Sequence, residues 1–136
     1  MRFTGHNDIL DVNKTTESII DAAIDVHRHL GPGLLESAYE ECLHEVLSLR
    51  KIPFSRQIAL PVTYKSRKQV VGYRIDLLVK SEVVVELKAV ESRSPIHEAQ
   101  TLTYMRPGGW QVGPILNFNV TILKNGIKRL VFKLKE

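Results

Sequence analysis

Apolar and polar residues alternate through one central stretch of the chain, Val71–Val90, which is interrupted once at Lys80-Ser81-Glu82. Residues two apart in a strand share a face, so the stretch predicts two strands of a β-hairpin that bury one apolar face. A shift of one residue would send one strand's apolar set to the wrong side, which determines the parity of the register. The apolar set is Ile75, Leu77 and Val79 on the first strand and Val83, Val85, Leu87 and Ala89 on the second.

The other face of this predicted hairpin carries charged side chains. The simplest register pivots on Ser81 and places Asp76 directly opposite Glu86, with their Cβ atoms about 5 Å apart. Lys88 follows two residues after Glu86 and shares that face. Facing carboxylates repel each other, and a divalent cation between them would remove the repulsion. Mg²⁺ favours such a setting of carboxylates, water and phosphate oxygens, to which the Leu87 carbonyl would add an oxygen.

The same charged residues allow a plainer interpretation. On a solvated face, Arg74 and Lys88 would offset Asp76 and Glu86 diagonally, and the face would need no ligand. Short motifs of this kind also occur by chance. The hairpin by itself therefore leaves both interpretations open.

Helical periodicity predicts three helices. Thr15 or Thr16 is a suitable N-cap for the first helix, and Gly31-Pro32-Gly33 would end it. The second helix is predicted from about Leu34 to Arg50. In the third, Ser94-Pro95 provides a cap and a first helical residue, and the helix would run to about Met105.

Two of these helices carry candidate site residues. Glu36 belongs to an otherwise apolar row with Tyr39 and Leu43, and a lone buried carboxylate is costly, so a partner inside the fold is expected. Alternatively, Glu36 simply favours the positive end of its helix, and position alone does not separate these readings. On the third helix one stripe would face either the carboxylates or water; it consists of His97, Gln100 and Tyr104.

Further strands are predicted before and after the central hairpin. The alternating stretch Ile58–Tyr64 contains Pro61, which cannot donate to a ladder and therefore predicts an edge or bulged strand. The basic turn Lys65–Lys68 follows it, and such a turn is usually only solvated. A buried strand is predicted over Val112–Asn119.

The chain is predicted to end in a hairpin whose turn is Asn125-Gly126, joining Thr121–Lys124 to Ile127–Leu134. The whole order is helix, helix, strand, hairpin, helix, strand and terminal hairpin. Strands bracketed by helices in this way predict an α/β sandwich on a mixed sheet.

Composition narrows the class of protein. A chain of 136 residues is long enough for one domain, predicted over residues 15–136 behind a loosely held arm of residues 1–14. The net charge of +4 and pI of about 9.3 are compatible with a polyanionic partner. A single cysteine, Cys42, excludes an intrachain disulfide and favours a reducing cytoplasm. Since we find neither a membrane-spanning apolar run nor a signal peptide, we expect a cytoplasmic protein without membrane contact.

Four separated motifs agree with one another. They are Asp76 followed by Glu86-Leu87-Lys88, the run Gly33–Tyr39 (GLLESAY), the run Val85–Glu91, and His97–Gln100 with Tyr104. The first resembles the D…(D/E)xK signature of PD-(D/E)XK nucleases, and the others resemble the small bacterial GxxExxY proteins, a branch of that superfamily. The resemblance covers about residues 17–132.

This resemblance implies a restriction-endonuclease-like core and a metal-dependent nuclease that hydrolyses phosphodiester bonds, in DNA rather than RNA. It implies that Mg²⁺ or Mn²⁺ is bound by Asp76, Glu86, the Leu87 carbonyl and Glu36. Lys88 would activate or hold the attacking water, and Gln100, with Tyr104 as a further support, would assist from the third helix.

Two other classes of function remain open from the sequence. One is a module that binds nucleic acid or a protein partner and retains the fold without turnover. The other is an assembly protein whose exposed strands, near Pro61 or in the terminal hairpin, pair between subunits. A homodimer would also suit a nuclease that cuts both strands of a duplex.

Overall fold

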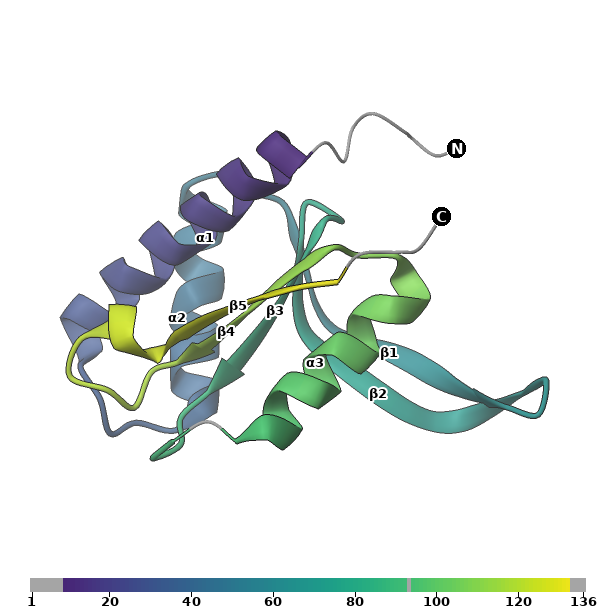
Figure 1. Ribbon diagram of the computed structural model, residues 1–136. Coiled ribbons are helices and arrows are strands. Elements are labelled where there is room, and N and C mark those ends of the chain that lie inside the picture. The colour runs from purple at the N-terminus through teal and green to yellow at the C-terminus, as the bar shows by residue number, and fades with distance from the viewer. Residues whose placement is uncertain (1–8, 93, 133–136) are drawn as a thin grey trace.

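The computed structural model describes residues 9–92 and 94–132, and these form a five-stranded sheet with helices on both faces (Figure 1). The strand order is β1-β2-β3-β4-β5, and every neighbouring pair is antiparallel except β3 with β4. The elements are α1 Ile9–Leu30, α2 Glu36–Leu49, β1 Phe54–Tyr64, β2 Arg67–Val79, β3 Val83–Lys88, α3 Pro95–Gly108, β4 Val112–Asn117, the 3₁₀ turn η2 Leu123–Gly126 and β5 Ile127–Val131. The predicted α/β architecture with a mixed sheet is confirmed.

Helix α1 begins earlier than predicted. Its first described residue is Ile9, so the prediction of a cap at Thr15 or Thr16 and of a loose arm through residue 14 is wrong for residues 9–14. The reason is that the apolar stripe continues upstream to Val12, which is buried in the core. Thr16 instead donates its hydroxyl to the Val12 carbonyl, 2.8 Å away. Residues 1–8 of the predicted arm lie outside the described residues.

The turn between α1 and α2 is held by one tyrosine. Gly31 and Gly33 have φ values of 67° and 100°, which favour glycine. The Tyr39 hydroxyl donates to the Gly31 carbonyl at 2.6 Å and accepts the Leu34 N–H at 3.1 Å. The Tyr39 ring is fully buried and stacks on Phe118, with 4.5 Å between the ring centroids. Tyr39 thereby sets the position at which α2 begins.

The central hairpin has the predicted register. Val79 pairs with Val83 and Leu77 with Val85, so the pairing pivots on residue 81. One face of the hairpin packs against α1 and α2, and its fully buried residues there are Leu77, Val79, Val83, Val85 and Leu87. Ile75 was predicted to share that face, but it packs in the opposite cluster with Val84 and Met105, because the regular alternation breaks at Asp76.

Helix α3 covers the second face of the sheet (Figure 1). A Cβ atom on Gly113 of β4 would lie 2.7 Å from the Met105 sulfur and 3.2 Å from the Val84 carbonyl oxygen. Glycine at this position therefore allows α3 to pack closely on the sheet. Val84 on the second face of the hairpin is consequently buried and not exposed to solvent.

Strand β1 lies at the edge of the sheet, as Pro61 predicted. Its register with β2 shifts between Pro61 and Thr63, which is the expected bulge. Beyond this point the two strands continue as a ribbon that projects from the body of the protein (Figure 1).

The predicted terminal hairpin differs in its first strand. Leu123–Gly126 forms the 3₁₀ turn η2, and β5 pairs with β4 instead of with Thr121–Lys124. Tertiary packing overrides the local turn signal here, because Leu123 is buried in the core. Gly126 approaches the end of β4 so closely that a Cβ atom would lie 2.1 Å from the Asn117 carbonyl oxygen.

Within the described ranges, none of the helices has the length and apolar character needed to cross a bilayer.

Replacing Tyr39 by phenylalanine should destabilise the fold, because the Gly31 carbonyl and the Leu34 N–H both lose their partner. We expect Tyr39→Phe to lower the free energy of unfolding by about 1–3 kcal/mol, measured by urea denaturation. The matched control is Tyr64→Phe, since Tyr64 is 61% exposed. Equal unfolding free energies for the two variants would contradict the role assigned to Tyr39.

Candidate active site

Two acidic side chains meet where the β2–β3 ladder opens. The Asp76 N–H donates to Glu86 Oε1 at 3.2 Å, and the Leu87 N–H donates to Asp76 Oδ2 at 2.9 Å. Each strand thus uses a carboxylate of its neighbour as the acceptor for a backbone N–H. This reciprocal exchange follows directly after the last regular pair, Leu77 with Val85. The two acids are therefore neighbours, as the pivot on Ser81 predicted.

Strand β1 is also irregular opposite Asp76. Its residue Gln57 has a φ of 51°, although its neighbours pair regularly with β2. This backbone conformation is uncommon for a residue other than glycine. The Gln57 side chain donates to Glu40 Oε2 on α2 at 2.7 Å. Regular strand pairing is therefore interrupted at Asp76 on both sides of β2, toward β1 and toward β3.

The environment of the two strand acids favours their neutral forms. Burial is the largest cause, and it raises the pKa of Asp76 to about 6 and that of Glu86 to about 8. The charge of Asp76 raises the pKa of Glu86 further, while the hydrogen bonds from backbone N–H groups and the charge of Lys88 oppose both shifts. Glu86 is only 4% exposed. The interpretation of a solvated charged face is therefore wrong for Glu86.

Glu36 approaches this pair from the first turn of α2. Burial raises its pKa, and the Lys88 charge is the largest opposing influence. Glu36 also raises the pKa of both strand acids, so the three carboxylates lie within electrostatic reach of one another and of Lys88. In the described part of the chain, however, no three His, Cys, Asp or Glu residues are grouped closely enough to hold a metal ion between them. Glu36 thus stands apart from the Asp76–Glu86 pair.

A fourth acid, Glu40, was not singled out from the sequence. It lies one turn after Glu36 on α2 and raises the pKa of Asp76. Glu40 also approaches His44 Nε2, 3.7 Å away, and accepts the hydrogen bond from Gln57. The spacing of four residues between Glu36 and Glu40 was the signal available in the sequence, because residues four apart share a helix face.

His44 continues this row of α2 and is buried. Its ring stacks on Phe54 with 5.2 Å between the centroids, and neither ring nitrogen has a hydrogen-bond partner among the described residues. Burial lowers the pKa of His44, and the charge of Arg56 lowers it further. His44 is therefore expected to be neutral, so it does not offset the charge of Glu40 beside it.

The predicted residues of α3 have different surroundings. His97 belongs to the helix cap, because the Ser94 N–H donates to its Nδ1 at 3.3 Å. Tyr104 packs against the cluster that contains Ile75 and Val84. Gln100 is exposed to solvent.

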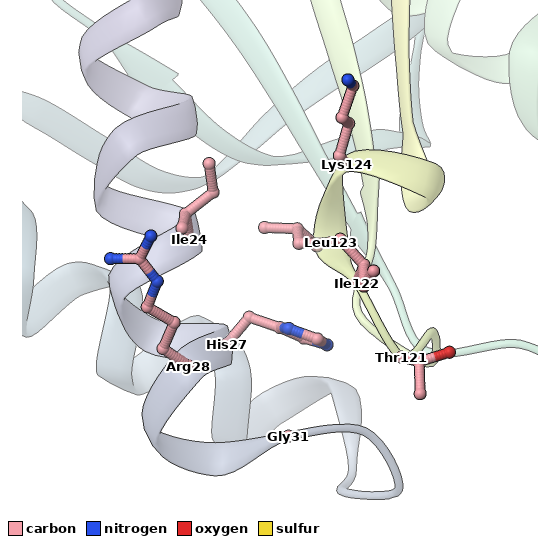
Figure 2. A pocket seen from close by; sticks show the side chains of 8 residues that line it. All are labelled: Ile24, His27, Arg28, Gly31, Thr121, Ile122, Leu123 and Lys124. Atoms are coloured by element: carbon pink, nitrogen blue, oxygen red, sulfur yellow. The ribbon is translucent and has the colours of Figure 1, made fainter.

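The hollow between α1 and the loop around η2 lies outside this group of acids. It has a volume of about 440 Å³ and is lined by Ile24, His27, Arg28, Gly31, Thr121, Ile122, Leu123 and Lys124. Figure 2 shows Ile24, His27 and Leu123 pointing into it, whereas Arg28 and Lys124 point away. Its histidine is bound to the Val120 carbonyl at 2.8 Å. Because its lining contains no acid, we locate the candidate chemistry at Asp76 and Glu86 instead.

The comparison with protein families agrees with this geometry. The family model of the PD-(D/E)XK nuclease superfamily matches residues 13–130. This range contains all four acids and every strand residue of the sheet except Val131. Neither the curated proteins nor the solved structures gave a match. A family match over most of the chain, together with an acid pair shared by β2 and β3 and a lysine two residues after Glu86 on β3, shows that the chain belongs to the PD-(D/E)XK nuclease superfamily.

Proposed function

We propose that this protein is a metal-dependent nuclease that hydrolyses phosphodiester bonds in DNA. The observation that carries the proposal is the pair formed by half-buried Asp76 and buried Glu86 beside the ammonium of Lys88. Burying two like charges is unfavourable, and active sites are where such perturbed acids gather. The glycine, glutamate and tyrosine of the run Gly33–Tyr39 further support a place in the GxxExxY branch, since Tyr39 positions the helix that carries Glu36.

The donor set fits Mg²⁺ or Mn²⁺. The hydrogen bonds between described residues occupy one oxygen of each strand carboxylate, which leaves the other oxygen for a cation. The N–H and C=O groups of a strand residue point toward the same neighbouring strand, so the Leu87 carbonyl faces the Asp76 side. Asp76, Glu86 and the Leu87 carbonyl would hold the ion, with Glu36 acting through water, because Mg²⁺ retains several waters. Such an ion lowers the pKa of a bound water and neutralises charge on the phosphate.

The chain itself would supply positioning and one positive charge. Lys88 would hold the attacking water or a phosphate oxygen where negative charge develops. Its backbone is held firmly, because the Phe118 N–H donates to the Lys88 carbonyl at 2.9 Å. Asn117 fixes the following segment through two hydrogen bonds with the backbone of Val90, of 2.9 and 3.1 Å. The backbone that carries the Lys88 side chain is thus fixed beside the acids.

Glu40, Gln100 and Tyr104 would act in supporting roles. Glu40 adds negative charge near Asp76 and would strengthen the attraction for a cation. Tyr104 packs against the residues behind Asp76 and would help to position β2. Gln100 is exposed and would contact substrate rather than the metal.

A non-catalytic binding module is the second candidate function. The mild positive charge of the chain supports this second candidate, since such a charge would suffice for binding a polyanion. The buried acids weigh against it, because a surface that only binds nucleic acid gains nothing from two carboxylates beneath it. Turnover separates the two candidates.

Substitutions at the acid pair should abolish cleavage. We expect Glu86→Gln and Asp76→Asn to lower the rate on plasmid or oligonucleotide DNA with Mn²⁺ by at least about 100-fold. Lys88→Met should cost about 100-fold as well, because it removes the one positive charge among the acids. Glu40→Gln should cost less, about 10-fold, because Glu40 acts through its neighbours.

The controls for this assay are Lys80→Met and Glu45→Gln, which remove exposed charges from the same hairpin and from the same helix. Both should cleave at the wild-type rate. If wild type cleaves no faster than Glu86→Gln on single-stranded and duplex DNA, the nuclease proposal is wrong.

Stability should depend on pH and metal through Glu86. Its pKa is raised from 4.5 to about 8, so the folded protein holds a proton that the unfolded chain releases. Because the folded protein binds this proton more tightly than the unfolded chain, the stability that Glu86 contributes is complete below about pH 4.5 and is lost as pH rises through about 8. Mn²⁺ binds the deprotonated pair, so it should raise Tm by at least about 3 °C at pH 8.5 and less at pH 5.5.

The readout is Tm by differential scanning fluorimetry in EDTA and in Mn²⁺, compared with Glu86→Gln. The variant should decline less between pH 5.5 and 8.5, because only the titration of Asp76, whose pKa is about 6, remains, and it should lose the gain from Mn²⁺. An equal Mn²⁺ gain in the variant would show that the ion binds elsewhere.

A further inference from the structure

The outer part of the β1–β2 ribbon projects from the protein as an arm, which we define as residues 59–74 (Figure 1). Among the described elements, β1 packs mainly against β2. The arm residues from Thr63 to Gln69 are all exposed, and no helix covers them in Figure 1. An exposed ribbon end of this kind adds little to the core, so core packing does not explain its presence.

The arm carries a concentrated positive charge. Its four basic residues, Lys65, Arg67, Lys68 and Arg74, are exposed, and none takes part in the ion pairs formed by the described residues. The sequence contains no acid between Glu45 and Asp76. The charge of the arm alone therefore equals the formal net charge of the whole chain, +4.

The tip of the arm is held in a tight turn. Tyr64 pairs with Arg67, and the two residues between them, Lys65 and Ser66, have φ values of 50° and 66°. Lys65 Nζ lies 5.4 Å from the centroid of the Tyr64 ring, and the Gln69 side chain donates to the Arg67 carbonyl at 3.3 Å. The charges at the tip are thus presented by an ordered turn.

The arm is joined directly to the acid pair. Strand β2 runs nine positions from Arg67 to Asp76, which at about 3.3 Å per residue is at most about 30 Å. Near its base, Gly72 approaches β1 so closely that a Cβ atom would lie 2.1 Å from the Leu60 carbonyl oxygen. Together with the bulge at Pro61, this contact sets the direction in which the arm leaves the sheet.

Protection of a sheet edge does not account for these charges. Edge strands are often guarded by charged residues along the edge itself. Here the edge strand β1 has no charged residue between Arg56 and Lys65, while the basic residues lie on the turn and on β2. Arg56 is paired with Glu41 and belongs to the body of the protein. The charge is placed at the projecting end, where a partner would meet it.

We propose that the arm grips duplex DNA next to the active site. A two-stranded ribbon fits the major groove of B-DNA, whereas the deep and narrow groove of A-form RNA does not admit one. The basic residues would contact phosphates as far as about nine base pairs from Asp76, since B-DNA rises 3.4 Å per base pair. The location of the cut relative to the arm rests on the proposed nuclease function, but the grip itself does not.

Binding measured without turnover tests the grip. The probe is a fluorescein-labelled 24-base-pair duplex, and its anisotropy is titrated in EDTA at several NaCl concentrations. The triple variant Lys65→Gln, Arg67→Gln, Lys68→Gln should bind at least tenfold more weakly at 150 mM NaCl. Its slope of log affinity against log salt should be smaller by two to three, because each lost phosphate contact removes about 0.9.

The matched control removes the same charge elsewhere, through Lys14→Gln, Lys124→Gln and Lys128→Gln, which are exposed on α1, η2 and β5. It should bind as wild type does. Equal binding by the two triple variants, no duplex binding by wild type, or equal arm-dependent binding of the single strand would each overturn the proposal. All variants should keep the wild-type Tm, since the substituted residues are exposed.

The same proteins separate this proposal from the nuclease function. If wild type binds duplex through the arm but cleaves nothing with Mn²⁺, the grip stands and the nuclease proposal fails. If wild type cleaves and the arm variant binds and cleaves equally well, the grip fails and the nuclease proposal stands.

Discussion

The structure depends on an exchange of hydrogen bonds between β2 and β3. In a regular ladder, backbone N–H groups donate to carbonyl groups of the neighbouring strand. Here the Asp76 N–H and the Leu87 N–H donate instead to carboxylates of the opposite strand. Opening the ladder leaves carboxylate oxygens and a carbonyl at the gap, and a sheet interior contains few other places where such groups are free to bind a ligand. Because buried N–H groups are costly to leave without an acceptor, neither acid is replaceable without disturbing the strand beside it.

The charges of this protein are segregated by sign. Glu36, Glu40 and Glu86 lie within electrostatic reach of Asp76, and the charge of Lys88 opposes the raised pKa values of Glu36, Asp76 and Glu86, while an excess of positive charge is carried on the arm. A phosphate would therefore be attracted to the arm and repelled from the acids until a cation is bound between them. Under the proposed function, this arrangement would join affinity for a polyanion, carried by the arm, to dependence on a metal, carried by the acids.

The sequence predicted the features that follow from alternation and helical period. Alternation predicted the parity of the register, the simplest register of that parity pivots on Ser81 as observed, and Pro61 predicted the edge strand and its bulge. Two of its failures have the same cause, which is tertiary packing that overrides a local signal. The Asn125-Gly126 turn signal is strong locally, but burial of Leu123 folds that segment into a 3₁₀ turn. The first helix extends to Ile9 because Val12 packs in the core, and no cap residue in the sequence indicates this earlier start.

The site was predictable only as far as it lies on the hairpin. Asp76 and Glu86 follow from strand register, whereas Glu40 reaches them from another element through Gln57. Gln57, which makes that contact, has a positive φ of 51°, which neither strand propensity nor alternation predicts. A strained residue held against a helix acid is the kind of departure from local rules that collects at functional sites. The irregularity of β1 is therefore part of the same construction as the open ladder: regular pairing is interrupted on both sides of Asp76, and the carboxylate is presented by a strand that pairs regularly just before and just after this position.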